Sequence, residues 1–274
     1  MEDLQEKTIM LIREIILAIA IVGVILAALW AYTGQFPHTP MVVVTSSSMM
    51  HENEPFGRIG TIDPGDLVLV KKVYSRNDII TRGDPLNPHT KHKTYGDYGD
   101  VIIYYPNGDK SSTPIIHRAI CYIERNPNGT YDIEEYGIHN AKSINLVELG
   151  LALPYHSSYE NYKPPHSGFI TKGDNNNECD QAGGLSSPVK LEWIVGKARG
   201  ELPWFGLIKL IFPPGNTEGQ WGYSGKDAVR IGYAVAPKDE WICLGISLFF
   251  IIVVPSSQDI YNFIKNWRKK RIQI

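Results

Sequence analysis

The sequence predicts a mainly β domain that lies between two transmembrane helices. Three observations predict this fold class: an apolar stretch near each end of the 274-residue chain, and a middle section without helical periodicity. Short runs rich in Val, Ile and Tyr, separated by turns that contain Gly and Pro, fill the section between residues 41 and 200. This pattern is typical of an all-β domain.

The first apolar stretch runs from Ile15 to Tyr32 and contains eighteen residues without a charge. As a helix it would be roughly 27 Å long, close to the hydrocarbon thickness of a bilayer. Trp30 and Tyr32 stand at one end, where aromatic residues favour the membrane interface. The alternative is a cleaved secretory signal, but the run is longer than usual for such a signal, and no good small-residue cleavage site follows it. We expect a retained anchor that ends in the proline-containing connector 33–40.

The second apolar stretch runs from Trp241 to Val254 and contains fourteen residues, which is short for a membrane span and long enough for a buried helix. A core or interfacial helix is therefore the alternative to a second span. We favour the span because a basic tail follows the stretch, with Lys265, Arg268, Lys269, Lys270 and Arg271.

The charge pattern predicts the orientation of both spans. Lys7 and Arg13 precede the first stretch, and no Lys or Arg follows it until Arg58. By the positive-inside bias the N-terminus is cytoplasmic, and so is the basic tail if the second stretch spans. Residues 1–40 then form a cytoplasmic tail, an anchor in the cell membrane and a connector. Residues 41–237 form the extracytoplasmic β domain, and 238–274 the second span with its cytoplasmic tail.

The β domain is expected to contain six strands and two long peripheral insertions. The insertions lie near residues 74–98 and 126–166, where polar sequence interrupts the strand pattern. The predicted strands are MVVVTS (41–46), DLVLVKKV (66–73), DVIIYY (100–105), PIIHRAICYI (114–123), SGFITKG (167–173) and LEWIVGKA (191–198).

Composition excludes some function classes. The formal net charge is −2 and no basic run appears before the C-terminus, so we expect no nucleic-acid partner. The cysteines Cys121, Cys179 and Cys243 are too few for a disulfide scaffold and form no C-x-x-C pair. Isolated thiols are favoured over a Cys121–Cys179 pair, and neither a cofactor nor a metal site is expected.

Several sequence boxes follow one another behind the predicted anchor. VVVTSSSMMH (42–51) is followed in order by PGDLVLV (64–70), GDVIIYYPNG (99–108), PIIHR (114–118) and KGDNNNECD (172–180). A serine run at a strand end is common and would mean little alone; the ordered set is a strong signal. With it the chain resembles type I signal peptidases of the archaeal and endoplasmic-reticulum kind. The resemblance implies a signal-peptidase-like antiparallel β domain.

The resemblance implies a serine-protease site with Ser48 as nucleophile and His117 as base. A serine hydroxyl is a weak nucleophile and needs a base to take its proton, a role that histidine can fill near neutral pH. The imidazole in turn needs a partner that fixes its tautomer. The resemblance points to Asp180 as this partner and to Asp174 as a nearby support, although Asp174 could equally be a plain turn residue.

Further residues are implied in substrate binding. The backbone N–H of Ser48 is one candidate donor to the oxyanion, and the hydroxyl of Ser46 is another, unless it only bonds locally at the strand end. Val42 and Val44 lie on a strand to which an extended substrate could add. From the family, we expect small pockets that select Ala-like side chains at the first and third positions before the cut.

One residue departs from the family pattern. The family usually has proline three residues after the nucleophile, where this chain has His51. His51 is thus a rival base, but three extended residues span roughly 10 Å, so a direct bond from Ser48 to His51 would need a turn.

The expected function is therefore a membrane-bound serine endopeptidase that removes N-terminal signal peptides from exported proteins at the outer face of the membrane. The implied partners are signal peptides of secretory preproteins and membrane lipid, and association with the secretion machinery is compatible with this function. The alternatives are a related self-processing serine protease and a membrane-tethered β domain for binding or envelope structure, in which the serines would be incidental.

Overall fold

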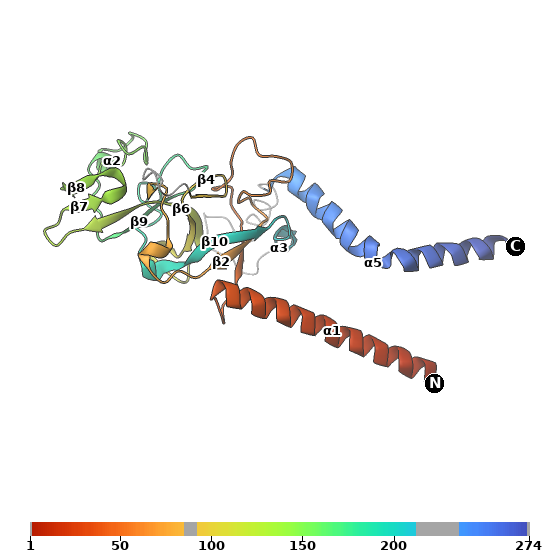
Figure 1. Cartoon of the computed structure of the whole chain (residues 1–274). Helices are drawn as coiled ribbons and strands as arrows, with labels where there is room; N and C mark the ends of the chain where they lie inside the picture. Colours follow the sequence, from red (N-terminus) through yellow and green to blue (C-terminus); the bar gives the residue numbers. More distant parts are fainter. Residues whose placement is uncertain (1, 85–91, 212–235, 273–274) are drawn as a thin grey trace. The chain divides into compact units, whose positions relative to one another are not determined.

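The computed structural model describes residues 2–84, 92–211 and 236–272 (Figure 1). The chain divides into two compact units. The first contains Met1–Val42, Ser48–His51 and Val68–Glu201, and the second contains Val43–Ser47, Glu52–Leu67 and Leu202–Ile274.

The first unit begins with a long helix and continues as an antiparallel sheet. In the described ranges, eight strands form this sheet in the order β1-β2-β10-β5-β6-β7-β8, with β9 paired to β6. The elements are α1 (Glu2–Thr33), β1 (Met41–Val43), β2 (Leu67–Lys71), β5 (Val101–Tyr104), β6 (Ile115–Arg125), β7 (Tyr131–Ile133), β8 (Ile138–Ala141), β9 (Gly168–Lys172) and β10 (Ile194–Leu202). The mainly β fold class is confirmed.

Shorter elements occupy the connections, including the two predicted insertions. The insertion 74–98, described apart from 85–91, holds η1 (Arg76–Asp78) and a separate hairpin of β3 (Lys93–Thr94) and β4 (Asp97–Tyr98). The insertion 126–166 extends the sheet through β7 and β8 and also contains η4 (Glu134–Tyr136) and α2 (Ser157–Glu160). Within the described residues of this unit, the other short helices are η3 (Pro106–Gly108) and η5 (Leu191–Trp193).

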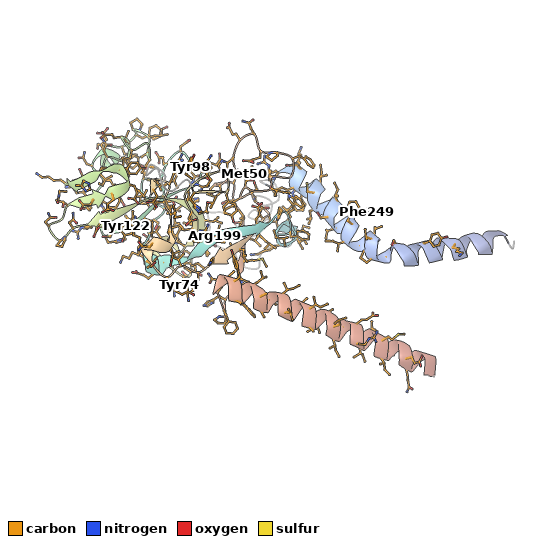
Figure 2. The ribbon with its side chains drawn as sticks, viewed as in Figure 1. Met50, Tyr74, Tyr98, Tyr122, Arg199 and Phe249 are labelled. Carbon is orange, nitrogen blue, oxygen red and sulfur yellow. The ribbon has the colours of Figure 1, made fainter. Side chains whose placement is uncertain are left out.

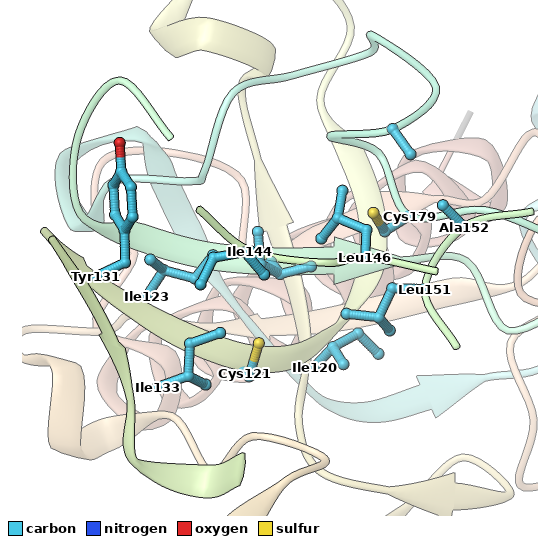
Figure 3. Packing of buried hydrophobic residues seen from close by; sticks show 12 residues of the cluster. Ile120, Cys121, Ile123, Tyr131, Ile133, Ile144, Leu146, Leu151, Ala152 and Cys179 are labelled. Atoms are coloured by element: carbon cyan, nitrogen blue, oxygen red, sulfur yellow. The ribbon is translucent and has the colours of Figure 1, made fainter. Parts of the chain in front are cut away.

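Strand β6 is the centre of the first unit because it pairs with β5, β7 and β9. Its buried residues contribute to the core that Figure 3 shows, around Ile120, Cys121 and Ile123. The insertion 126–166 supplies other members of this core, among them Ile144 and Leu146, so the insertion is part of the hydrophobic interior. Cys121, Cys179 and Cys243 are all free and buried.

Gly99 and Asp100, the first two residues of the box GDVIIYYPNG, have a structural role. Asp100 is fully buried and accepts hydrogen bonds from the Ile80 N–H (3.0 Å) and Lys197 Nζ (2.9 Å). Burial opposes ionisation, but these hydrogen bonds hold the pKa of Asp100 below its usual value. A side chain at Gly99 would lie 2.5 Å from the Arg82 nitrogen, and its φ is +85°, so glycine fits where other residues would not.

The second unit contains α3 (Leu207–Ile211) and α5 (Lys238–Ile272). Leu207 and Leu244 are buried together with Ala236. The loop 52–66 is tied to the start of α5, because the Gly57 N–H donates to Asp239 Oδ2 at 2.9 Å. Helix α5 runs through Pro255 and bends along its length (Figure 1), as is usual for a helix with an internal proline.

Two helices are long and apolar enough, by length and composition, to cross a membrane: Thr8–Thr33 and Lys238–Ser257. At 1.5 Å per residue they measure roughly 39 Å and 30 Å. In the most apolar stretch of each helix, 0% and 11% of the residues are buried, whereas the core helix of a soluble protein is mostly buried. The side chains of α5, Phe249 among them, project outward from the helix (Figure 2). Both helices are therefore candidates for membrane association.

Candidate active site

Three segments of the first unit bring Ser48, His117 and Asp180 together. Ser48 lies in a turn after β1. His117 lies on β6 opposite Ile102 of β5, and β9 pairs with the same strand. Asp180 follows β9, and its backbone N–H donates to Thr171 O at 2.9 Å, which fixes the returning loop against the strand.

The three side chains form a continuous chain of hydrogen bonds. Ser48 Oγ lies 2.9 Å from His117 Nε2, and His117 Nδ1 lies 2.8 Å from both carboxylate oxygens of Asp180. A carboxylate can only accept, so Nδ1 carries the proton and Nε2 is left to accept the hydroxyl proton of Ser48. This arrangement can activate a hydroxyl as a nucleophile.

The carboxylate of Asp180 is buried and fully supplied with donors. Besides His117 it accepts from Tyr104 Oη and Thr171 Oγ1, each at 2.6 Å, and its exposed fraction is 3%. Burial and the nearby charge of Asp180 raise the pKa of Tyr104 well above its usual value, so this phenol stays protonated and donates. Tyr104 and Thr171 were not among the predicted site residues, although both lie on strands, β5 and β9, that pair with the strand of His117.

Asp174 makes a separate ion pair. Its two oxygens accept from Arg118 Nε at 2.8 Å and from the Arg118 guanidinium nitrogen Nη2 at 2.5 Å, and Asp174 Oδ2 also lies 2.9 Å from His51 Nε2. Of the two carboxylates whose roles sequence left open, Asp180 is thus the one in contact with His117. His51 contacts Asp174, while the Ser48 hydroxyl contacts His117.

Arg118 also holds the hairpin β3–β4. The side chain is fully buried and donates to the carbonyl oxygens of Thr94 (3.0 Å), Tyr95 (3.2 Å) and Gly99 (2.9 Å). Because His117 and Arg118 are consecutive on β6, their side chains leave the strand in opposite directions. His117 contacts Ser48, while Arg118 joins the insertion 74–98 to Asp174 in the loop after β9.

The predicted substrate-binding residues fall at the start of the sheet. Ser46 belongs to the second unit, where it is exposed, and its oxyanion role remains a prediction. Val44 is buried, its N–H donates to Asp66 O (3.0 Å), and its carbonyl accepts from the Gly65 N–H (3.0 Å). The N–H and C=O groups of Val44 are thus already hydrogen-bonded. Because backbone groups alternate in direction along a strand, those of Val42 point to the same side as those of Val44. The backbone N–H and C=O groups of Met41 and Val43 therefore point to the other side of the strand.

Within the described ranges, no group of three or more His, Cys, Asp or Glu side chains is placed to hold a metal ion. Comparison with protein-family models gives no match to this chain, and neither does comparison with curated proteins.

Proposed function

We propose that this protein is a membrane-anchored serine endopeptidase that removes N-terminal signal peptides from exported proteins. The observation that carries the proposal is the hydrogen-bonded chain Ser48–His117–Asp180. The order of the sequence boxes and the antiparallel sheet support the same proposal, with a signal-peptidase-like fold.

The reaction follows from the three side chains. Ser48 Oγ attacks the scissile carbonyl carbon while its proton passes to His117 Nε2, and Asp180 stabilises the imidazolium that forms. The imidazolium then protonates the leaving amine, the C–N bond breaks and an acyl ester remains on Ser48. Water, deprotonated by His117, hydrolyses this ester and regenerates the serine. The Ser48 N–H and the Ser46 hydroxyl are the proposed oxyanion donors.

A membrane anchor on this protein would bring Ser48 close to the bond that is cut. The scissile bond of a signal peptide lies just beyond its own hydrophobic segment, and Ser48 lies fifteen residues beyond Thr33, the end of α1. A nucleophile tethered this close in sequence to a membrane anchor meets a membrane-bound substrate at high effective concentration. The substrate would pair as an added strand along β1, in register with Met41 and Val43.

The proposal includes an orientation, with the β domain outside the cell membrane and both termini in the cytoplasm. The three native thiols are buried, so an introduced cysteine can be labelled with low background. An Asn77→Cys variant, at an exposed position in the insertion 74–98, should react with an impermeant thiol reagent on intact cells. A cysteine placed after Arg271 should react only after permeabilisation, and labelling of that tail in intact cells would contradict the second span.

The function itself is tested by incubating the purified full-length protein in detergent with a secretory precursor and identifying the new N-terminus of the product by mass spectrometry. We expect one cut just after the hydrophobic segment of the signal peptide, with a small residue before the cut. Intact precursor, or cuts scattered along the mature region, would contradict a signal-peptide endopeptidase.

A further inference from the structure

His51 belongs to the segment that carries the nucleophile. The stretch Ser48–His51 is part of the first unit, although the residues on either side, Val43–Ser47 and Glu52–Leu67, belong to the second. Four residues must therefore be held within the first unit by contacts of their own. The position of the Ser48 hydroxyl depends on how firmly these contacts hold.

Two contacts join this segment to the loop after β9. The Asn175 N–H donates to the carbonyl oxygen of Ser48 at 2.9 Å, and His51 Nε2 lies 2.9 Å from Asp174 Oδ2. The loop approaches closely, because a side chain at Gly173 would lie 2.6 Å from the same Ser48 oxygen. The turn is thus fastened at its first residue through the backbone and at its last through a side chain.

The carboxylate that accepts from His51 is buried and paired with Arg118. Arg118, with no exposed surface, binds both oxygens of Asp174, and only 6% of the Asp174 side chain is exposed. Since a carboxylate only accepts, His51 Nε2 must carry the proton and act as the donor. The His51 ring also packs against the β3–β4 turn, where a side chain at Gly96 would come within 3.1 Å of His51 Cε1.

We propose that His51 is a positioning residue that holds the Ser48 turn against the loop after β9 through its hydrogen bond to Asp174. Arg118 extends this network to β6, the strand that carries His117, so the nucleophile and the base are held in register by one set of contacts. His51 does not act as the base, since its Nε2 is occupied by Asp174.

The first test measures kcat and KM for precursor cleavage and rests on the proposed function. His51→Phe keeps a ring against Gly96 and removes the donor; we expect kcat to fall about 10- to 100-fold with little change in KM, because a small displacement of a nucleophile slows chemistry more than binding. His51→Gln, whose amide can donate from a similar position, should restore most of this loss. His139→Ala, at an exposed position on β8, is the matched control and should leave both constants unchanged.

The second test does not depend on peptidase activity. In a Ser48→Cys background, the thiol beside His117 should be activated towards iodoacetamide near neutral pH. Adding His51→Phe should slow its alkylation about tenfold by moving the thiol away from the imidazole, and adding His51→Gln should not.

The outcomes separate the two proposals. Unchanged kcat and unchanged alkylation in His51→Phe would overturn the positioning role, and so would failure of His51→Gln to restore either rate. If the wild-type protein cleaves no precursor, the endopeptidase proposal fails, while the alkylation rates still decide the role of His51.

Discussion

Ser48→Ala and His117→Ala are each expected to lower the rate of precursor cleavage by on the order of 10⁶-fold, close to background, because nucleophile and base act as a unit. Ser48→Ala removes the attacking oxygen, and His117→Ala leaves the hydroxyl without a proton acceptor at 2.9 Å. Initial rates with one precursor in one detergent give the measurement.

Both variants should remain folded. In His117→Ala the Asp180 carboxylate keeps its bonds from Tyr104 and Thr171, so no uncompensated buried charge appears. His166→Ala, which removes a histidine that packs on Trp193, is the control for loss of a ring outside the site. Substantial turnover by His117→Ala, with its thermal midpoint unchanged, would show that another group takes the proton.

Asp180→Asn is expected to cost on the order of 10⁴-fold in turnover, as in comparable triads whose acid becomes an amide. An amide in place of the carboxylate can present an N–H to His117, which favours the imidazole tautomer that cannot accept the Ser48 proton. The domain should stay folded, because the amide has nearly the same shape. The measurement is cleavage rate beside thermal midpoint.

Asp174→Asn is the matched comparison, since it makes the same chemical change on the neighbouring carboxylate. It leaves the buried Arg118 without its counter-charge, and breaking a buried ion pair costs roughly 3–5 kcal/mol. We therefore expect a clear fall in thermal midpoint and a smaller loss of turnover than in Asp180→Asn. A well-folded, inactive Asp174→Asn beside an active Asp180→Asn would contradict the proposed role of Asp180.

Tyr104→Phe is expected to lower turnover less than Asp180→Asn does. It removes one donor to Asp180 without changing the packing volume, and a lost hydrogen bond to a charged group corresponds to a drop in turnover of about tenfold or somewhat more. Tyr131→Phe, which loses a buried hydrogen bond to Pro164 O, should leave turnover unchanged.

The local features of the fold were predictable from sequence because they depend on neighbouring residues. The apolar run 15–32 lies within α1, and the Val- and Ile-rich runs 66–73 and 100–105 contain β2 and β5. The second apolar stretch ends at Val254, directly before Pro255, yet α5 continues to Ile272. Proline removes one backbone hydrogen bond and often bends a helix without ending it, and α5 bends along its length (Figure 1).

The candidate site was predictable only in part. Ser48 and His117 stand in recognisable boxes, but the spacing of Asp174 and Asp180 does not reveal which one reaches the imidazole. That depends on the return of the chain after β9, where Asp180 N–H bonds Thr171 O. The insertion 126–166 reads as peripheral because polar residues separate its few apolar ones. Some of these, including Ile144 and Leu146, are buried in one core with Ile120 and Ile123 of β6, which the sequence pattern does not reveal.

The central claim is that the Ser48 hydroxyl performs the cleavage, and the most direct test is precursor turnover by wild type, Ser48→Ala and Ser47→Ala, measured side by side. The two variants remove the same atom from adjacent residues, so general effects of losing a hydroxyl from this turn cancel. We expect Ser47→Ala to yield the wild-type product at a rate close to that of wild type, and Ser48→Ala to yield none above background. Product formation by Ser48→Ala at a rate comparable to wild type would contradict the account.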